Sequence, residues 1–138
     1  MDNYSIFDIA TWFKKEIDPS EKKLQKLLYY SEAWCNALYN KSLYKNAYFI
    51  AAPNGPITPQ LSKQSEKNTT EIKNDKVIQL LQSIIETYGD LSENELEVIS
   101  RKEQPWRSAR IGYTEGEPCE NKISKTEMKS YYRAIYKK

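Results

Sequence analysis

Residues 18–38 read DPSEKKLQKLLYYSEAWCNAL, and this stretch predicts a long amphipathic helix. Asp18 suits the N-cap, Pro19 the first helical position, and Glu21 the position from which a carboxylate reaches back to the cap amide. At helical spacing, the residues divide between two faces. The face expected to enter a core holds Leu24, Leu27, Leu28, Ser31, Trp34, Cys35 and Leu38. The face expected to meet solvent holds Lys22, Gln25, Lys26, Tyr29, Glu32 and Asn36. A tyrosine among charges is closer to a recognition surface than to catalytic machinery.

Capping signals predict further helices on both sides of this stretch. Ser5 with Asp8, and Ser92 with Glu95, form capping boxes, in which each side chain bonds the backbone amide of the other residue. The expected helices cover residues 5–17, 18–38, 75–88, 92–104, 104–110 and 124–135, the fifth being one short turn. Trp12 lies off the apolar stripe of the first helix, so it either packs beside the second helix or is exposed.

Residues 47–59 predict a strand followed by a rigid turn. The run AYFIAA at 47–52 is apolar, aromatic and of strand-like length. The run PNGPITP at 53–59 contains three prolines and a glycine, which preclude a regular helix and fix a turn of defined shape. Loops of this kind commonly carry function. Residues 62–76 are polar apart from Ile72 and are expected to form a solvent-exposed loop.

These patterns predict a mainly α fold. At 138 residues the chain is long enough for one hydrophobic core, whereas two separate cores would be strained. We expect a single compact helical domain over residues 1–138, with about five to six helices and a short strand or hairpin near residues 47–58. Residues 134–138 are expected to form a basic tail.

Composition narrows the class of partner. A typical nucleic-acid binder carries a clustered basic stripe, whereas the positive and negative charges of this chain nearly balance, with a formal net charge of +2. This balance argues against a nucleic-acid partner. No apolar run approaches the roughly 20 residues needed to cross a bilayer. The N-terminus also lacks a basic segment followed by an apolar one, so no secretory signal is predicted. We therefore expect no membrane association and a cytoplasmic location.

The chain contains no histidine, which removes the usual general base, the histidine-activated nucleophiles and most zinc sites. Its four glycines match neither the phosphate-binding loop nor the dinucleotide spacing. We therefore expect no catalytic residues, no metal site and no cofactor, so the chain is not expected to be an enzyme. Cys35 and Cys119 are expected to be reduced thiols, although the sequence alone allows a disulfide between them.

Four motifs follow one another along the chain. They are KLQKLLYYSEAW at 23–34, GPITP at 55–59, LEVIS at 96–100 with KEQPW at 102–106, and an Ile-Ser pair at 123–124 leading to tyrosines at 131 and 132. In this order and spacing they resemble the Panacea domain of SocA-like antitoxins. The resemblance spans residues 6–133.

This resemblance implies a mostly helical domain with a little strand and a cytoplasmic antitoxin, from a bacterium or a phage. Such an antitoxin neutralises a partner toxin by binding it directly. One family member is similar in sequence yet acts as a proteolytic adaptor, which delivers its toxin to a protease. The chain departs from the family's usual residues at Ala52, Pro53, Asn54, Gln60, Leu61, Ser100 and Arg101, which makes it a divergent member.

The expected contact site combines the polar face of the second helix with the nearby turn. The residues expected to contact a protein partner, the cognate toxin, are Lys22, Lys26, Tyr29, Asn54, Gly55, Pro56 and Pro59. The residues expected to support them from the core are Leu24, Leu27, Trp34, Pro105 and Trp106. Trp106 has a second interpretation as an exposed stacking platform for a base or a cation.

Two other functions stay open at this point. A nucleic-acid-binding regulator would use the basic face of the last helix, formed by Lys125, Lys129, Arg133, Lys137 and Lys138. An accessory protein of a phage or mobile element would bind a host factor instead. The sequence predicts no particular oligomeric state.

Overall fold

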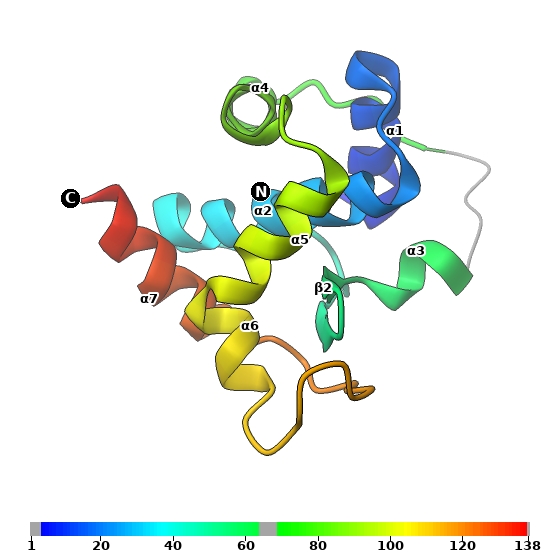
Figure 1. Cartoon of the computed structure of the whole chain (residues 1–138). Helices are drawn as coiled ribbons and strands as arrows, with labels where there is room; N and C mark the ends of the chain where they lie inside the picture. The colour runs from blue at the N-terminus through cyan, green and yellow to red at the C-terminus, as the bar shows by residue number, and fades with distance from the viewer. Residues whose placement is uncertain (1–3, 64–68, 138) are drawn as a thin grey trace.

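The chain folds mainly into helices, with one small antiparallel hairpin (Figure 1). The computed structural model describes residues 4–63 and 69–137. In that part of the chain the elements are α1 (Ile6–Ile17), α2 (Glu21–Tyr39), β1 (Ile50–Ala52), β2 (Gly55–Ile57), α3 (Pro59–Lys63), α4 (Asp75–Tyr88), α5 (Glu93–Lys102), α6 (Gln104–Ala109) and α7 (Lys125–Tyr136). The mainly α fold and the hairpin near residues 47–58 are confirmed. The described residues form seven helices rather than five or six because the sequence pattern does not predict α3.

Helix α2 is the centre of the fold. Figure 1 shows it running through the middle of the molecule, and it contacts α1, α4, α5, α7 and β2. The face of α2 that was expected to meet solvent is therefore covered, and its buried members are Gln25, Lys26, Tyr29, Glu32 and Asn36. That expectation was wrong because polarity along a helix does not reveal which neighbours will cover it. Of the same face, Lys22 is exposed.

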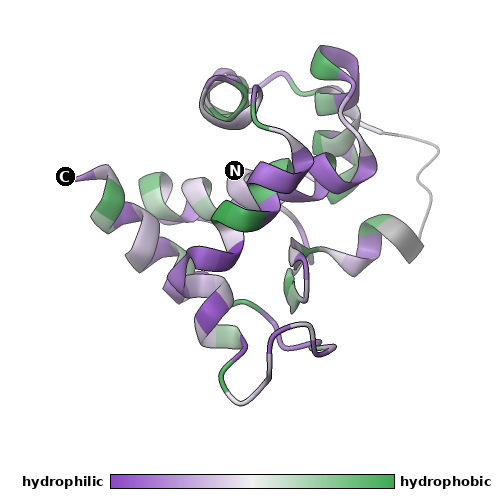
Figure 2. Cartoon of the chain, in the orientation of Figure 1, coloured by the Kyte–Doolittle hydropathy of each residue, from purple (hydrophilic) through white to green (hydrophobic). Residues whose placement is uncertain are grey.

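Burial of these polar residues is compatible with a stable core only if their polar atoms find partners. Among the described side chains, no buried nitrogen or oxygen atom lacks a hydrogen-bond partner. The other helices bury one side only. Figure 2 shows hydrophilic and hydrophobic residues alternating along α1, α5 and α7, as expected for helices that lie on the surface of a core.

The start of α2 differs from the prediction. Asp18 ends α1 as its C-cap, in the left-handed conformation with φ 47°, and the N-cap of α2 is Ser20. The Ser20 hydroxyl accepts from the Lys23 amide at 3.2 Å. Pro19 explains the break, because a residue before proline is disfavoured in the right-handed helical conformation that would join the two helices. The capping boxes at Ser5 and Ser92 are confirmed.

The far end of α2 also differs from the prediction. Leu38, which was expected in the core, is partly exposed, and Trp34 is half-buried. Ile135, the last residue of the helix predicted over 124–135, is exposed as well. The structure continues α7 to Tyr136 within the segment expected to be a basic tail, and residue 138 lies outside the described residues.

The polar loop expected over 62–76 is shorter at both ends, because α3 runs to Lys63 and α4 begins at Asp75. Residues 64–68 of that loop lie outside the described part. Ile72 is buried in the core rather than exposed. The Thr70 amide donates to Asp8 Oδ1 at 2.7 Å, so residues 70–72 are attached to α1.

Glu32 joins α2 to the connector that follows it and to α7. Its carboxylate is fully buried and accepts from the Leu43 amide and from Ser42 Oγ, each at 2.7 Å. Lys125 Nζ, at the start of α7, lies 3.3 Å from Glu32 Oε2. One buried carboxylate therefore holds three segments of the chain together.

In the part of the chain that the structure describes, no helix combines the length and the apolar character that spanning a bilayer would require. No disulfide joins Cys35 to Cys119, and both side chains are buried.

Replacing Glu32 by alanine should lower the free energy of unfolding by about 3 kcal/mol, because the buried Leu43 amide and Lys125 would lose their acceptor. Urea denaturation followed by circular dichroism measures this change. Glu86→Ala, on the exposed side of α4, is the matched control and should change the free energy by less than about 0.5 kcal/mol. Equal urea midpoints for the two variants would contradict the role given to Glu32.

Candidate functional site

The hairpin forms the middle of the candidate site. Strands β1 and β2 pair antiparallel, with Ala51 opposite Pro56 and Ala52 opposite Gly55, so Pro53 and Asn54 form its tip. The other edge of β1 is covered too, because the Ala51 amide donates to the Asn121 carbonyl at 3.0 Å. A two-stranded hairpin is marginally stable by itself, so its shape depends on what surrounds it.

Gln25 binds the end of the hairpin from within α2. Its side-chain Nε2 donates to the Thr58 carbonyl at 3.2 Å, and its Oε1 accepts from the Thr58 amide at 2.8 Å. Thr58 is fully buried. The Gln25 amide thus completes both backbone hydrogen bonds of one residue, as a neighbouring strand would.

Gly55 lies where α2 and α5 approach the hairpin most closely. A Cβ atom on Gly55 would be 2.8 Å from Lys26 Cε and 2.9 Å from Ser100 Oγ, closer than real Cβ contacts allow. Its φ of 119° is also unfavourable for any residue with a side chain. The glycine is therefore required by the space as well as by the backbone conformation.

Two side chains from α6 and its C-terminus bind the opposite strand. Trp106 Nε1 donates to the Ala52 carbonyl at 2.9 Å, and Arg110 Nη1 donates to the Ala51 carbonyl at 2.7 Å. The Arg110 guanidinium lies 5.0 Å from the centre of the Trp106 ring, within the range of a cation–π interaction. Trp106 is half-buried, and it both holds the Ala52 carbonyl and stacks against the Arg110 cation. We call Gln25, Trp106 and Arg110 the hairpin clamp.

A buried network of tyrosines joins α2 to α7 and to Glu103. Glu103 Oε1 accepts from Tyr30 at 2.8 Å and from Tyr132 at 2.7 Å, and the hydroxyls of Tyr132 and Tyr29 are 3.2 Å apart. The Tyr30 ring stacks on Tyr88 at 4.0 Å between centroids. Burial raises the pKa of Glu103, while the two hydroxyl donors oppose that shift. This network fixes Tyr29 in the core.

Sequence reasoning missed the roles of Gln25, Glu103 and Arg110. Gln25 and Glu103 lie inside the motifs at 23–34 and 102–106, so the motifs contained them without revealing what they bind. Arg110 lies just beyond the last of these motifs. Neither the local pattern around Gln25 nor that around Glu103 or Arg110 predicts these contacts, because each joins segments distant in sequence.

The structure brings the expected contact residues together but buries most of them. Lys26 is 2% exposed and Tyr29 is 1% exposed, so both present almost no surface to a partner in this conformation. Gly55 and Pro56 are buried as well, and Pro59 is half-buried. Lys22 and Asn54 remain exposed. Among the expected supporting residues, Leu24, Leu27 and Pro105 are buried, and Trp34 and Trp106 are half-buried.

Lys22 and Asn54 line a shallow groove of about 280 Å³ between the hairpin tip, the start of α2 and α5. Glu97 lines it from α5, and Pro53 and Ile57 add apolar surface. We call this the hairpin groove. An exposed cation, an amide and a carboxylate around an apolar floor suit contact with a protein surface.

The buried Lys26 ammonium also lines this groove. Burial lowers the pKa of Lys26 to about 8 from its ordinary value of 10.5, and Glu97 opposes that shift. Among the described residues, no group of three or more cysteine, aspartate or glutamate side chains is arranged to hold a metal ion.

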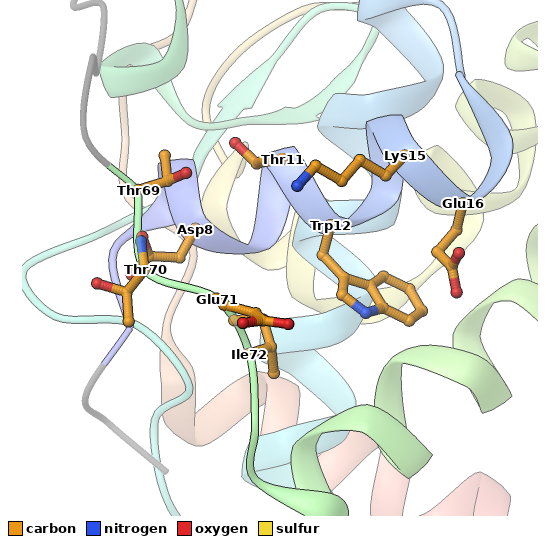
Figure 3. A pocket seen from close by; sticks show the side chains of 9 residues that line it. All are labelled: Asp8, Thr11, Trp12, Lys15, Glu16, Thr69, Thr70, Glu71 and Ile72. Atoms are coloured by element: carbon orange, nitrogen blue, oxygen red, sulfur yellow. The ribbon is translucent and has the colours of Figure 1, made fainter.

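A second hollow, of about 500 Å³, lies between α1 and residues 69–72. Figure 3 shows Trp12, Lys15 and Glu16 projecting from α1, with the segment that carries Glu71 facing them. Trp12 is half-buried and packs its edge against Phe13, with 5.3 Å between ring centroids. None of the expected contact residues lines this hollow.

Comparisons with known proteins give one finding. The model of the family described as antitoxin SocA-like, Panacea domain, matches residues 24–107. A search of curated proteins and a search of solved structures found no significant match.

Gln25→Ala should lower the free energy of unfolding by about 2 kcal/mol, because the buried Thr58 amide would lose its acceptor while the Thr58 carbonyl would keep only the Leu61 amide. Urea denaturation measures the loss, and Gln79→Ala on the exposed side of α4 is the matched control. A Gln25 variant as stable as its control would show that the hairpin does not need this contact.

Lys26→Met should stabilise the protein at pH 7 by up to about 3 kcal/mol, because a methionine of similar shape removes a buried charge. Since the pKa of Lys26 is lowered in the folded state, the unfolded state binds more protons between about pH 8 and pH 10.5. As the pH rises through this window, the free energy of unfolding of the wild-type protein should therefore increase relative to that of the methionine variant.

Urea denaturation of both proteins between about pH 7 and pH 10 measures this difference. Burial raises the pKa of Tyr29 and Tyr30, which lowers stability above about pH 10, but this effect is common to both proteins and cancels in the comparison. A stability difference that does not change with pH would contradict the buried charge on Lys26.

Proposed function

The chain belongs to the SocA-like antitoxin family, with a Panacea domain over residues 24–107, and we propose that it neutralises a partner toxin by binding that toxin directly. The matched residues cover nearly all of α2, the hairpin, α5 and the start of α6. They therefore include Gln25 and Trp106 of the hairpin clamp, whereas Arg110 lies just beyond them. The proposal treats the chain as a binding protein rather than an enzyme.

We infer that the hairpin groove contacts the toxin. Two observations support this inference. Lys22, Asn54 and Glu97 line the groove, and the hairpin beneath them is held by the hydrogen bonds of Gln25 and Trp106. A surface that is already ordered loses little conformational entropy on binding, which favours affinity. The groove is small, so a toxin would extend beyond it onto neighbouring surfaces.

The test uses co-expression with the small protein encoded beside this chain, provided that this neighbour stops growth when expressed alone. Wild-type chain should restore growth. The variant Lys22→Glu/Asn54→Ala should raise the Kd for the toxin at least about tenfold and fail to restore growth, because it reverses one contact charge and removes another polar contact. Titration calorimetry on the purified pair measures the Kd.

The matched control is Lys76→Glu/Gln79→Ala, which makes the same two changes on the exposed side of α4. It should restore growth as well as the wild-type chain does. Loss of neutralisation in both double variants, or in neither, would reject the hairpin groove as the contact site. Failure of the wild-type chain to bind or neutralise the toxic neighbour would reject the function itself.

The same experiment separates two ways of neutralising a toxin. If the chain blocks the toxin, toxin abundance should stay constant while growth recovers. If the chain acts as a proteolytic adaptor, growth should recover as toxin abundance falls, and recovery should require the host protease.

A further inference from the structure

A pocket of about 440 Å³ lies between α5, α6 and the loop that follows α6, and it is rich in cations. Its basic side chains are Arg101, Lys102, Arg107 and Arg110. Glu115 is the one carboxylate among its lining residues, so four positive charges and one negative charge leave +3. The whole chain carries a formal charge of only +2, so positive charge is concentrated at this place. We call it the basic pocket.

The cations of the basic pocket are not neutralised by neighbours. Among the described residues, the one ion pair is that of Lys125 with Glu32, which lies elsewhere. Arg110 is the clearest case, because it is 6% exposed and its guanidinium donates only to backbone carbonyls, at Ala51, Thr114 and Glu117. Carbonyl groups orient a guanidinium but do not cancel its charge, so the pocket keeps a positive potential that favours an anion.

Apolar and aromatic side chains form the rest of the pocket's lining. Val98 is 41% exposed and Tyr113 is 40% exposed, and the half-buried Trp106 ring, which contacts Arg110, also lines the pocket. Large apolar side chains at this degree of exposure, beside arginine and tryptophan, are typical of the anchoring sites of protein interfaces. A fitting ligand therefore combines carboxylates with an apolar side chain.

We propose that the basic pocket binds an acidic peptide segment that carries an apolar residue. This proposal rests on the proposed function: the acidic segment belongs to the toxin, whose contact surface is therefore acidic. A nucleic acid fits less well, because the cations gather in one pocket rather than along a stripe.

The basic pocket and the hairpin groove are neighbours. Glu97 lines the groove, and Val98 and Arg101 on the same helix line the pocket. Trp106 of the pocket donates to the carbonyl of Ala52, which lines the groove. One partner surface can therefore reach both, with the acidic segment following the hairpin into the pocket.

The test is fluorescence anisotropy with the full chain and a short fluorescein-labelled peptide of alternating glutamate and leucine. This peptide should bind with a Kd below about 1 mM, and the same peptide with glutamine for glutamate should bind at least about tenfold more weakly. Arg101→Glu/Arg107→Glu should weaken binding of the acidic peptide at least about tenfold. Glu115→Gln should strengthen it, because it removes the one like charge.

Lys73→Glu/Lys76→Glu is the matched control, since both lysines are exposed and lie outside the pocket. It should leave the Kd unchanged within about twofold. Urea denaturation of each variant verifies that the fold is retained. Equal binding of the glutamate and glutamine peptides, or equal weakening by the two double variants, would overturn the proposal.

A single-stranded oligonucleotide of matched charge provides the competing probe. Tighter binding of the oligonucleotide than of the acidic peptide would overturn the proposal in favour of nucleic acid. A failure of the basic-pocket proposal can be distinguished from a failure of the proposed function. A toxin neutralised equally by wild type and Arg101→Glu/Arg107→Glu, with no peptide binding, rejects the pocket alone, whereas peptide binding without any neutralisation rejects the function alone.

Discussion

The structure depends on burying helix α2 on all sides while satisfying every polar group that it carries into the core. Gln25 does so by pairing with the backbone of Thr58, and Glu32 by accepting from the connector and from α7. Asn36 bonds the Glu32 carbonyl one turn back at 2.8 Å. Each of these bonds joins α2 to another part of the chain or to itself, so the polar residues of this helix specify which segments pack against it and in what register.

Local signals in the sequence predicted some helix starts correctly and missed the start of α2, where the N-cap is Ser20 rather than Asp18. The boxes that begin at Ser5 and Ser92 depend on residues three positions apart, and both form as predicted. The solvent face of α2 was predicted wrongly, because its burial depends on β2, α5 and α7, which are distant in sequence. The candidate site was predicted in the same uneven way. The meeting of α2 with the hairpin followed from the family resemblance, but the burial of Lys26 and Tyr29 depends on tertiary packing that no local pattern contains.

Around the hairpin, the residues that pack in the core differ from the residues proposed to contact the partner. Lys26, Gly55 and Ser100 fill the space beneath the hairpin and leave no room for change. Lys22 and Asn54 lie above that space and bear little of the packing. Positions at which the chain departs from the family's usual residues are found in both layers, since Asn54 is exposed at the tip whereas Ser100 is buried against Gly55.

The hairpin clamp has a consequence for how such a protein can evolve. Gln25, Trp106 and Arg110 hold the hairpin through backbone groups of Thr58, Ala52 and Ala51, and none of these bonds involves a side chain of the hairpin. Mutations at the tip can therefore accumulate with little effect on its geometry. A lineage that inherits the clamp can replace the residues displayed there one by one and acquire a new partner without passing through an unfolded ancestor.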